Sequence, residues 1–261
     1  MTVVGLRRNA VLLAAYAEHT FLAVLGWRAF MFTLVAQAVV PPLLGLAVWT
    51  RALPDREQVA AYFTVLLFVR MLTVSYEPQT FLNAIYSGSL TDALLLPRPV
   101  VLEQLGKNLA WRAWHVLLAL PLLAAVGLVT SVRVSWTDVA LAVPALVLAA
   151  ALRFIFTFTL VLAAFWTQRA QAIAAAGAQL VFLLGGEAAP IPLLPDAHRS
   201  WVAALPFRSM IGFPAEVAAG LASGPELLAG YAWQLVWLAA FALATAQVWR
   251  LGVRRYTAVG G

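Results

Sequence analysis

Residues 78–112 read PQTFLNAIYSGSLTDALLLPRPVVLEQLGKNLAWR. This stretch lies between two strongly apolar blocks, and its polar side chains recur at helical spacing. Helix-breaking residues interrupt it at Ser87-Gly88 and again at Pro97 and Pro99. The pattern therefore predicts a hairpin that leaves the membrane and returns, with a short helix from Ser89 to Leu96 between the two breaks.

The composition outside this hairpin is that of an integral membrane protein. The chain has 261 residues, of which 63% are hydrophobic and 11% are charged, and its mean hydropathy is +0.89. A soluble domain carries about 25% charged residues. The apolar blocks are longer than the alternating strands of a membrane barrel, so the predicted fold is all-α. Cysteine is absent, which excludes disulfides, thiol nucleophiles and thiolate metal sites.

The apolar blocks predict six transmembrane helices in one membrane domain, residues 1–261. The predicted spans are residues 30–50, 58–76, 111–130, 138–166, 171–184 and 227–249. The surface hairpin between the second and third spans covers residues 78–110. Pro41 and Pro42 fall inside the first span, where neighbouring helices tolerate a kink.

Residues 6–26 precede the first span and have two interpretations. The basic start at Arg7 and Arg8, followed by a short apolar core, is typical of a signal peptide. The alternative is a helix lying in the membrane interface, with Glu18 and the other charged residues facing water. We favour the interfacial helix.

Residues 185–220 differ from the other segments because they contain five prolines and stay apolar between them. Such a segment does not form one helix, and it is too apolar for a free loop. We expect short re-entrant helices packed against the spans at the outer surface.

The distribution of basic residues predicts the orientation. Six spans place both termini and the hairpin on one side, and that side holds ten Lys and Arg residues: Arg7, Arg8, Arg28, Arg98, Lys107, Arg112, Arg169, Arg250, Arg254 and Arg255. The remaining loops hold five: Arg51, Arg56, Arg133, Arg199 and Arg208. The positive-inside rule therefore predicts cytoplasmic termini and a cytoplasmic hairpin. Most acidic residues, including Glu187, fall on the outer side.

The formal charge of +6 would suggest nucleic acid in a soluble protein. Here the basic residues flank spans, so we interpret them as topological signals beside anionic lipid and expect no nucleic acid partner. No GxxxxGK[ST] or strand-linked GxGxxG sequence occurs, so the chain has no ATPase site of those types. The three histidines are far apart, which predicts no metal site. A Ser/His/Asp hydrolase needs an exposed serine in a strained turn, and the sequence shows no such serine.

Two arginines lie inside predicted spans and are candidates for the translocation path. A charge at mid-membrane costs about 2.5–3.5 kcal/mol even on the lenient insertion scale. Arg70 is near enough to the cytoplasmic end of its span to snorkel, which is the simpler interpretation. Arg153 lies near the middle of its span, so it should face the bundle interior, a partner subunit or an aqueous cavity. We expect its counter-charge to belong to a partner, a lipid phosphate or the substrate.

Two further patterns have more than one interpretation. Asp92, Arg98 and Glu103 could form a solvated face or salt bridges, but the helix breaks around them favour a short helix on which a soluble motor acts. The small residues of AIAAAGAQ, residues 172–179, permit close helix packing within this chain or against another subunit.

Two stretches resemble the membrane permeases of type-2 ABC exporters, in particular the subgroup that pairs two different six-span permeases with one ATPase. The first is IYSGSLTDALLLPRP, Ile85–Pro99, which is similar to the family pattern of Ser-Gly, an acidic residue and a Leu-rich run into Lys/Arg-Pro. The second runs from the Phe-Trp-Thr turn at Phe165 through Ile-Pro-Leu and Leu-Pro-Phe to Pro214. One departure is Gly185-Gly186-Glu187, where the family pattern has Ser-Gly and an apolar residue.

The resemblance implies an exporter permease without its own ATPase site. It implies a dimer of permeases, the second a different chain or a copy, on two cytoplasmic ATPase subunits that bind ATP and Mg²⁺, so this chain itself needs no cofactor. The resemblance also implies that the N-terminal segment is an interfacial connecting helix and that Ser87–Glu103 contains the coupling helix. The implied ATPase-coupling residues are Ser87, Gly88, Asp92, Pro97, Arg98, Pro99 and Glu103. The implied outer gate contains Gly185, Gly186, Pro190, Pro192, Pro206 and Phe207.

The predicted function is ATP-driven export of an amphipathic or lipid-like compound or drug across the cytoplasmic (inner) membrane. One alternative is a membrane-embedded enzyme or assembly factor without an ATPase partner. It would show several His, Asp or Glu residues converging inside the membrane. Another alternative is a secondary transporter, which would show two similar halves with broken helices at matching positions. The sequence shows neither pattern.

Overall fold

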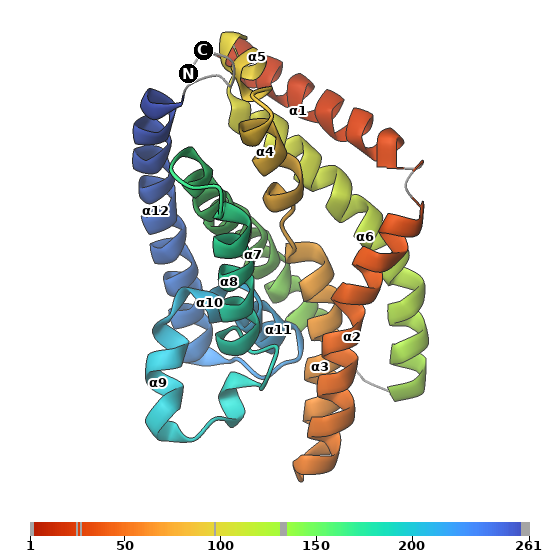
Figure 1. The fold of residues 1–261 in the computed structure, drawn as a ribbon. Coiled ribbons are helices and arrows are strands. Elements are labelled where there is room, and N and C mark those ends of the chain that lie inside the picture. Colours follow the sequence, from red (N-terminus) through yellow and green to blue (C-terminus); the bar gives the residue numbers. More distant parts are fainter. Residues whose placement is uncertain (1–2, 25, 27, 97, 131–134, 257–261) are drawn as a thin grey trace.

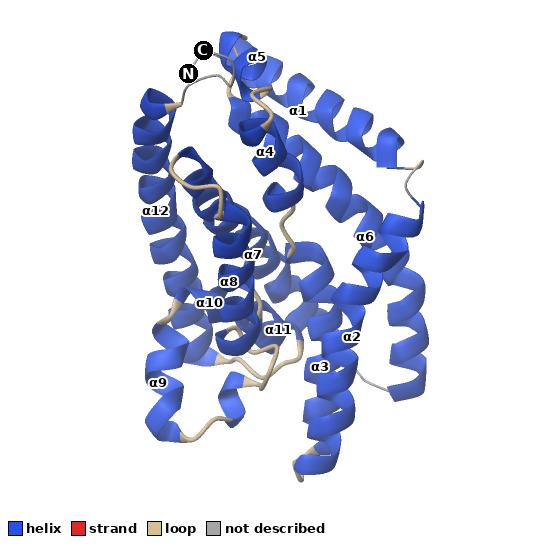
Figure 2. Cartoon of the chain, viewed as in Figure 1, coloured by secondary structure: helices blue, strands red, loops and turns tan. Residues whose placement is uncertain are grey.

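The computed structural model describes residues 3–24, 26, 28–96, 98–130 and 135–256. These residues form helices and connecting loops, and the described part of the chain contains no strand (Figure 2). The all-α prediction is confirmed for them.

The first half of the chain forms six helices, each placed near a predicted element. They are α1 (Val3–Val24), α2 (Arg28–Ala52), α3 (Arg56–Thr73), α4 (Glu77–Tyr86), α5 (Leu90–Leu95) and α6 (Val100–Thr130). Most of the predicted interfacial segment forms α1, whose position in the membrane interface stays a prediction, and a short helix, α5, lies between the two breaks. Asp55 caps α3 by accepting a hydrogen bond from the Gln58 backbone N–H.

The second half has long helices at its ends and short ones between them. They are α7 (Trp136–Val161), the 3₁₀ helix η1 (Leu162–Phe165), α8 (Ala170–Leu184), η2 (Ile191–Leu193), α9 (Asp196–Ala204), α10 (Pro206–Met210), α11 (Gly212–Ala218) and α12 (Gly224–Arg255). Prolines stand at the start of η2, α10 and α12, where a missing N–H costs little. The proline-rich segment is therefore a series of short helices, as its sequence predicts.

Three described runs are long and apolar enough to cross a membrane: Arg56–Tyr86, Trp136–Phe165 and Gly224–Arg255. They overlap the second, fourth and sixth predicted spans, and the first of them also includes the start of the predicted hairpin. Helices α2, α6 and α8 occupy the positions of the other three, whose crossing of the membrane stays a prediction.

Two element boundaries differ from the sequence-based ones. The apolar run that begins with α3 reaches Tyr86, beyond the predicted second span of residues 58–76, and a short break between Thr73 and Glu77 divides it. No break separates the hairpin from the third span, because α6 is one continuous helix from Val100 to Thr130. The second arm of the hairpin is thus the start of a long helix, so the hairpin is rigidly joined to the bundle.

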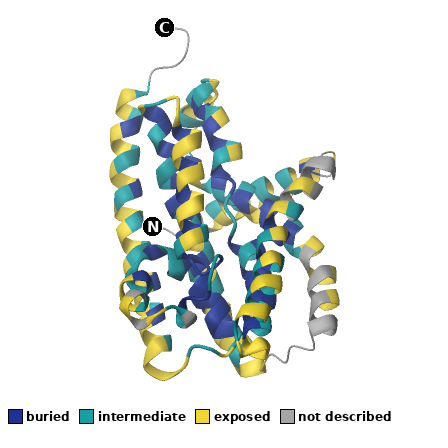
Figure 3. Cartoon of the chain, turned by 60° about the horizontal axis from the view of Figure 1, so that its bottom comes forward, coloured by how far each residue is buried: buried dark blue, intermediate teal, exposed yellow. Residues whose placement is uncertain are grey.

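The helices are arranged with the hairpin and the proline-rich segment at opposite ends (Figure 1). The described start of α1, the described end of α12 and α5 share one end, which we call the terminal end. Helices α9, α10 and α11 lie toward the other, which we call the distal end. Buried residues concentrate between the helices, and exposed residues cover the outward faces of long helices such as α12 (Figure 3).

Close approach of α1 to α6 depends on Gly106. A Cβ atom at this position would lie 2.6 Å from Cβ of Tyr16, far inside van der Waals contact. The stacked rings of Phe21 and Trp114, 4.6 Å apart, continue this packing toward the end of α1. Helix α1 therefore lies along the first half of α6.

Candidate functional site

The interruption between α3 and α4 is the centre of the candidate site. Val74 has an extended conformation, with φ −56° and ψ 148°, and Pro78 stands in the first turn of α4. Broken backbone at membrane depth needs other groups to satisfy its N–H and C=O groups. Those groups come from α6.

Asn108 and Arg112 of α6 bind the interrupted backbone. The Asn108 carboxamide oxygen accepts a hydrogen bond from the Tyr76 N–H at 3.3 Å, and its nitrogen donates to the Glu77 carboxylate at 2.5 Å. Arg112 donates to the carbonyl oxygens of Val74 at 3.1 Å and Ala150 at 2.9 Å. Asn108 and Glu77 are fully buried, so the break is held by a polar network inside the bundle.

His115 continues this network toward the cavity described below. Its Nδ1 lies 2.9 Å from the Trp111 carbonyl oxygen, and we assign the ring proton to that nitrogen. Nε2 then accepts a hydrogen bond from the Tyr76 hydroxyl at 2.8 Å. Asn108, Arg112 and His115 lie one and two turns apart, so they form one polar face of α6.

Arg70, on the last turn of α3, forms an ion pair with Glu187. Its other terminal nitrogen donates to the Gln37 carbonyl oxygen of α2 at 3.4 Å. The sequence analysis favoured snorkelling of Arg70 toward the cytoplasm and placed Glu187 in the outer loops. The structure instead gives Arg70 a partner within the chain, because the segment after α8 brings the Glu187 carboxylate to it.

Arg153 of α7 faces a cavity of about 340 Å³ beside the interruption. Its Nη1 is buried and has no hydrogen-bond partner among the described residues. The polar side chains of the cavity wall come from six elements and include Gln37, Arg70, Ser75, Gln79, His115, Thr157, Gln171 and Gln179. The structure thus brings Arg70 and Arg153, the two predicted intramembrane charges, to one cavity.

The predicted coupling residues gather at the terminal end. Ser87 ends α4, Gly88 turns the chain with a positive φ of 82°, and Asp92 is exposed on α5. Glu103 forms an i,i+4 ion pair with Lys107 at 2.7 Å. Pro99 is exposed just before α6, and Pro97 lies outside the described residues.

Two features fix the hairpin, and a third leaves it open to a partner. Leu90 is buried among apolar residues of α4, α6 and α7. The Arg98 guanidinium lies over the Tyr16 ring of α1, 5.1 Å from its centroid. Leu95 and Leu96, by contrast, are 79% and 44% exposed, which leaves an apolar surface at the end of α5.

The predicted outer-gate residues lie at the turns and helix ends that follow α8. Gly185 caps α8, and Gly186 has a φ of 96° and accepts a hydrogen bond from the Tyr62 hydroxyl at 2.9 Å. Pro190 and Pro192 lie at η2, and Pro206 begins α10. The Phe207 ring packs edge-on against Phe156 of α7, with centroids 6.1 Å apart. Gly185 and Gly186 directly precede Glu187 in the chain, and a Cβ atom at Gly185 would lie 3.1 Å from the Phe207 carbonyl oxygen.

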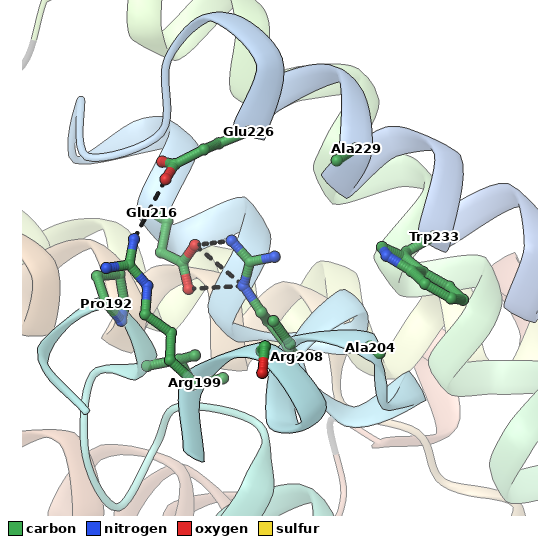
Figure 4. A pocket seen from close by; sticks show the side chains of 11 residues that line it. Pro192, Arg199, Ala204, Arg208, Glu216, Glu226, Ala229 and Trp233 are labelled. Atoms are coloured by element: carbon green, nitrogen blue, oxygen red, sulfur yellow. Dashed lines mark hydrogen bonds and ion pairs between the residues drawn. The ribbon is translucent and has the colours of Figure 1, made fainter. Parts of the chain in front are cut away.

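A second cavity, of about 440 Å³, lies at the distal end between η2, α9, α10, α11 and α12. Figure 4 shows its two ion pairs, Arg208 with Glu216 and Arg199 with Glu226. Burial opposes the charge of Arg208, but the Glu216 carboxylate that accepts its hydrogen bonds raises the pKa of Arg208 above its ordinary value. Each cation in this cavity therefore has its own carboxylate.

The network on α6 and the ion pairs of Arg70, Arg199 and Arg208 were not predicted from the sequence. The spacing of Asn108, Arg112 and His115 was a usable signal, because polar residues one and two turns apart in an apolar helix face one partner. Nothing local indicated the pairing of Arg70 with Glu187. Among the described residues, no group of His, Cys, Asp and Glu side chains is arranged to hold a metal ion.

A family model described as ABC-2 family transporter protein matches residues 30–260. No curated protein matches the chain. The match covers the interrupted helix, the hairpin, both cavities and the last long helix. The chain therefore belongs to the ABC-2 transporter family, whose members are multi-pass membrane permeases that generally lack an ATPase site of their own and partner an ATPase subunit.

Proposed function

We propose that this permease exports an amphipathic or lipid-like compound or drug outward across the cytoplasmic (inner) membrane. Six spans, with both termini in the cytoplasm, would place the hairpin against the ATPase. Two permeases would act as a dimer on two ATPase subunits, which bind the ATP and Mg²⁺. The second permease would be a different chain or a copy of this one.

One observation carries the proposal: α4, the first arm of the hairpin, extends from the turn before α5 to the polar cavity. Its last residue, Tyr86, precedes Ser87 and the turn into α5, while its first turn carries Pro78 and Gln79 of the cavity wall. A ten-residue helix is stiff along its axis, so displacement of the hairpin moves the cavity wall. The exposed leucines Leu95 and Leu96 give an ATPase an apolar surface on which to act.

Two other elements would move with α4. Arg98 lies over Tyr16, so α1 is attached to the same hairpin. At the distal end, the segment after α8 lies against α3 through Tyr62 and Arg70. We propose that this segment, with Gly185, Gly186, Pro190, Pro192, Pro206 and Phe207, forms the outer gate.

The test is co-purification from the native host in mild detergent. The native chain should bring down a nucleotide-binding subunit, and Asp92→Arg combined with Leu95→Asp should lose it, because both side chains are exposed on α5. The matched control is Ala197→Asp combined with Ser200→Arg, two exposed positions of α9. Recovery of no nucleotide-binding protein with any chain, or equal loss with the control, would contradict the proposal.

A further inference from the structure

The charges around the polar cavity do not balance. Of its neighbouring arginines, Arg70 pairs with Glu187 and Arg112 donates to two carbonyl oxygens. Glu77 accepts from Asn108 and acts on Arg153 only through space. Three arginines thus stand against two carboxylates, and Arg153 has no hydrogen-bonded counter-charge among the residues that the structure describes.

An unpaired guanidinium inside a membrane protein is costly unless a ligand or a cavity compensates it. Arg153 lines the cavity, with its Nη1 buried and lacking any described partner. A guanidinium presents a planar set of donors that matches the oxygens of phosphate, sulfate or carboxylate. An oxyanion would therefore supply the acceptors that this guanidinium needs.

The rest of the cavity wall fits the same ligand. Amide groups of Gln171 and Gln179 offer further donors, while Ala174, Ala178 and Phe156 make the remainder apolar. The volume of about 340 Å³ is in the range of small-ligand pockets. On α8 the lining residues Gln171, Ala175, Ala178 and Gln179 are exposed, so an apolar tail has a way out of the cavity along that helix.

We propose that Arg153 binds the oxyanion headgroup of an amphipathic substrate in this cavity. The inference rests on the proposed export function and narrows its substrate to anionic amphiphiles. Arg70 and the glutamine side chains line the same cavity, and Arg153 supplies the charge that distinguishes an anionic headgroup from a neutral one.

The experiment measures binding of two lipids with the same fluorescent acyl chain to the purified, full-length permease. Phosphatidic acid carries the oxyanion, and the matched diacylglycerol lacks it. The native chain should prefer phosphatidic acid by about tenfold or more, the range of one charged hydrogen bond. Arg153→Gln should abolish this preference without weakening diacylglycerol binding, and Arg153→Lys should keep most of it.

The matched control is Arg51→Gln, which removes an exposed arginine whose guanidinium donates only to the Ala47 carbonyl oxygen of its own helix. If Arg153→Gln does not fold, Ala178→Phe fills the cavity from an exposed position and should weaken phosphatidic acid binding. Equal affinity of the native chain for both lipids, or an unchanged preference in Arg153→Gln, would overturn the proposal.

Inorganic phosphate, added as a competitor, identifies which part of the ligand is bound. Displacement of the lipid shows that the oxyanion alone suffices, and no displacement shows that the tail is also needed; the Arg153 dependence supports the proposal in both cases. Failure of this inference is separable from failure of the export function. If co-purification recovers an ATPase subunit but the permease shows no preference for phosphatidic acid, only the proposed headgroup site is wrong. If the preference depends on Arg153 but no ATPase subunit is recovered, only the proposed export mechanism is wrong.

Discussion

Arg70, at the end of α3, forms an ion pair with Glu187, which follows the Gly185-Gly186 turn after α8. The contact joins the interrupted helix to the proline-rich segment of the distal end. The sequence resemblance led us to expect an apolar residue at position 187, and the pairing with Arg70 gives the acidic side chain a structural role. The pair therefore links the cavity wall to the proposed outer gate.

We predict that Glu187→Gln strongly destabilises the protein. The Glu187 side chain is 2% exposed, and removing one partner of a buried pair costs about 3–5 kcal/mol. The double variant with Arg70→Gln should recover part of that loss. The measurement is the midpoint of heat-induced loss of the monodisperse peak in detergent.

The matched control for this pair is Glu226→Gln, which breaks the more exposed pair with Arg199. A surface pair contributes little, so the midpoint should barely move. An equal shift for Glu187→Gln and Glu226→Gln would show that the Arg70 pair does not stabilise the fold.

Asn108→Leu should destabilise the interruption between α3 and α4. The change leaves the Tyr76 N–H and the Glu77 carboxylate without their partner, and each buried unsatisfied group costs about 1–3 kcal/mol. Asn83→Leu is the control, since Asn83 is exposed and its side chain donates only to a carbonyl oxygen of its own helix. The measurement is the same thermal midpoint in detergent. Comparable midpoints for Asn108→Leu and Asn83→Leu would show that Asn108 does not stabilise the break between α3 and α4.

Gly106→Val should detach α1 from α6. Even a Cβ at this position would lie 2.6 Å from Cβ of Tyr16 and 3.1 Å from the Leu13 carbonyl oxygen. Trypsin should then cut faster at Arg7 and Arg8, which are exposed on α1. Ala113→Val, at an exposed position of α6, should leave the rate unchanged; no acceleration in Gly106→Val would contradict the packing.

Tyr16→Ala should weaken the attachment of the hairpin to α1 without unfolding the bundle. The Arg98–Tyr16 contact is a cation–π interaction of about 0.5–2 kcal/mol. We expect a reduced yield of the nucleotide-binding subunit in co-purification, and Tyr16→Phe should keep the native yield because it retains the ring. Equal yields for Tyr16→Ala and Tyr16→Phe would exclude a part for the ring in coupling.

The absence of cysteine makes the proposed orientation testable with single-cysteine variants. Ala197→Cys at the distal end should react with a membrane-impermeant maleimide in intact cells. Ser89→Cys at the hairpin should react only after the membrane is opened, because positive-inside topology places it in the cytoplasm. Labelling of Ser89→Cys in intact cells would show that the hairpin lies outside the cytoplasm, which contradicts the proposed orientation.

Local patterns in the sequence determined the helices. The hydrophobic blocks, the breaks at Ser87-Gly88 and before Pro99, and the prolines of residues 185–220 act on the chain within a few residues, so α5 and the short helices α9 to α11 form where these patterns predict. Even the polar face of Asn108, Arg112 and His115 is a property of one helix, readable from its spacing.

Only the tertiary structure decided which residues of other elements these helices contact. The interruption at Val74 forms because α6 supplies Asn108 and Arg112 to its backbone groups, and such partners are invisible in the sequence of α3 itself. The same holds for Arg70, which could have reached the interface alone but pairs with Glu187 from a segment far along the chain. Desolvating an ion or a broken backbone is favourable only when a partner from another element is present, and the fold alone places that partner.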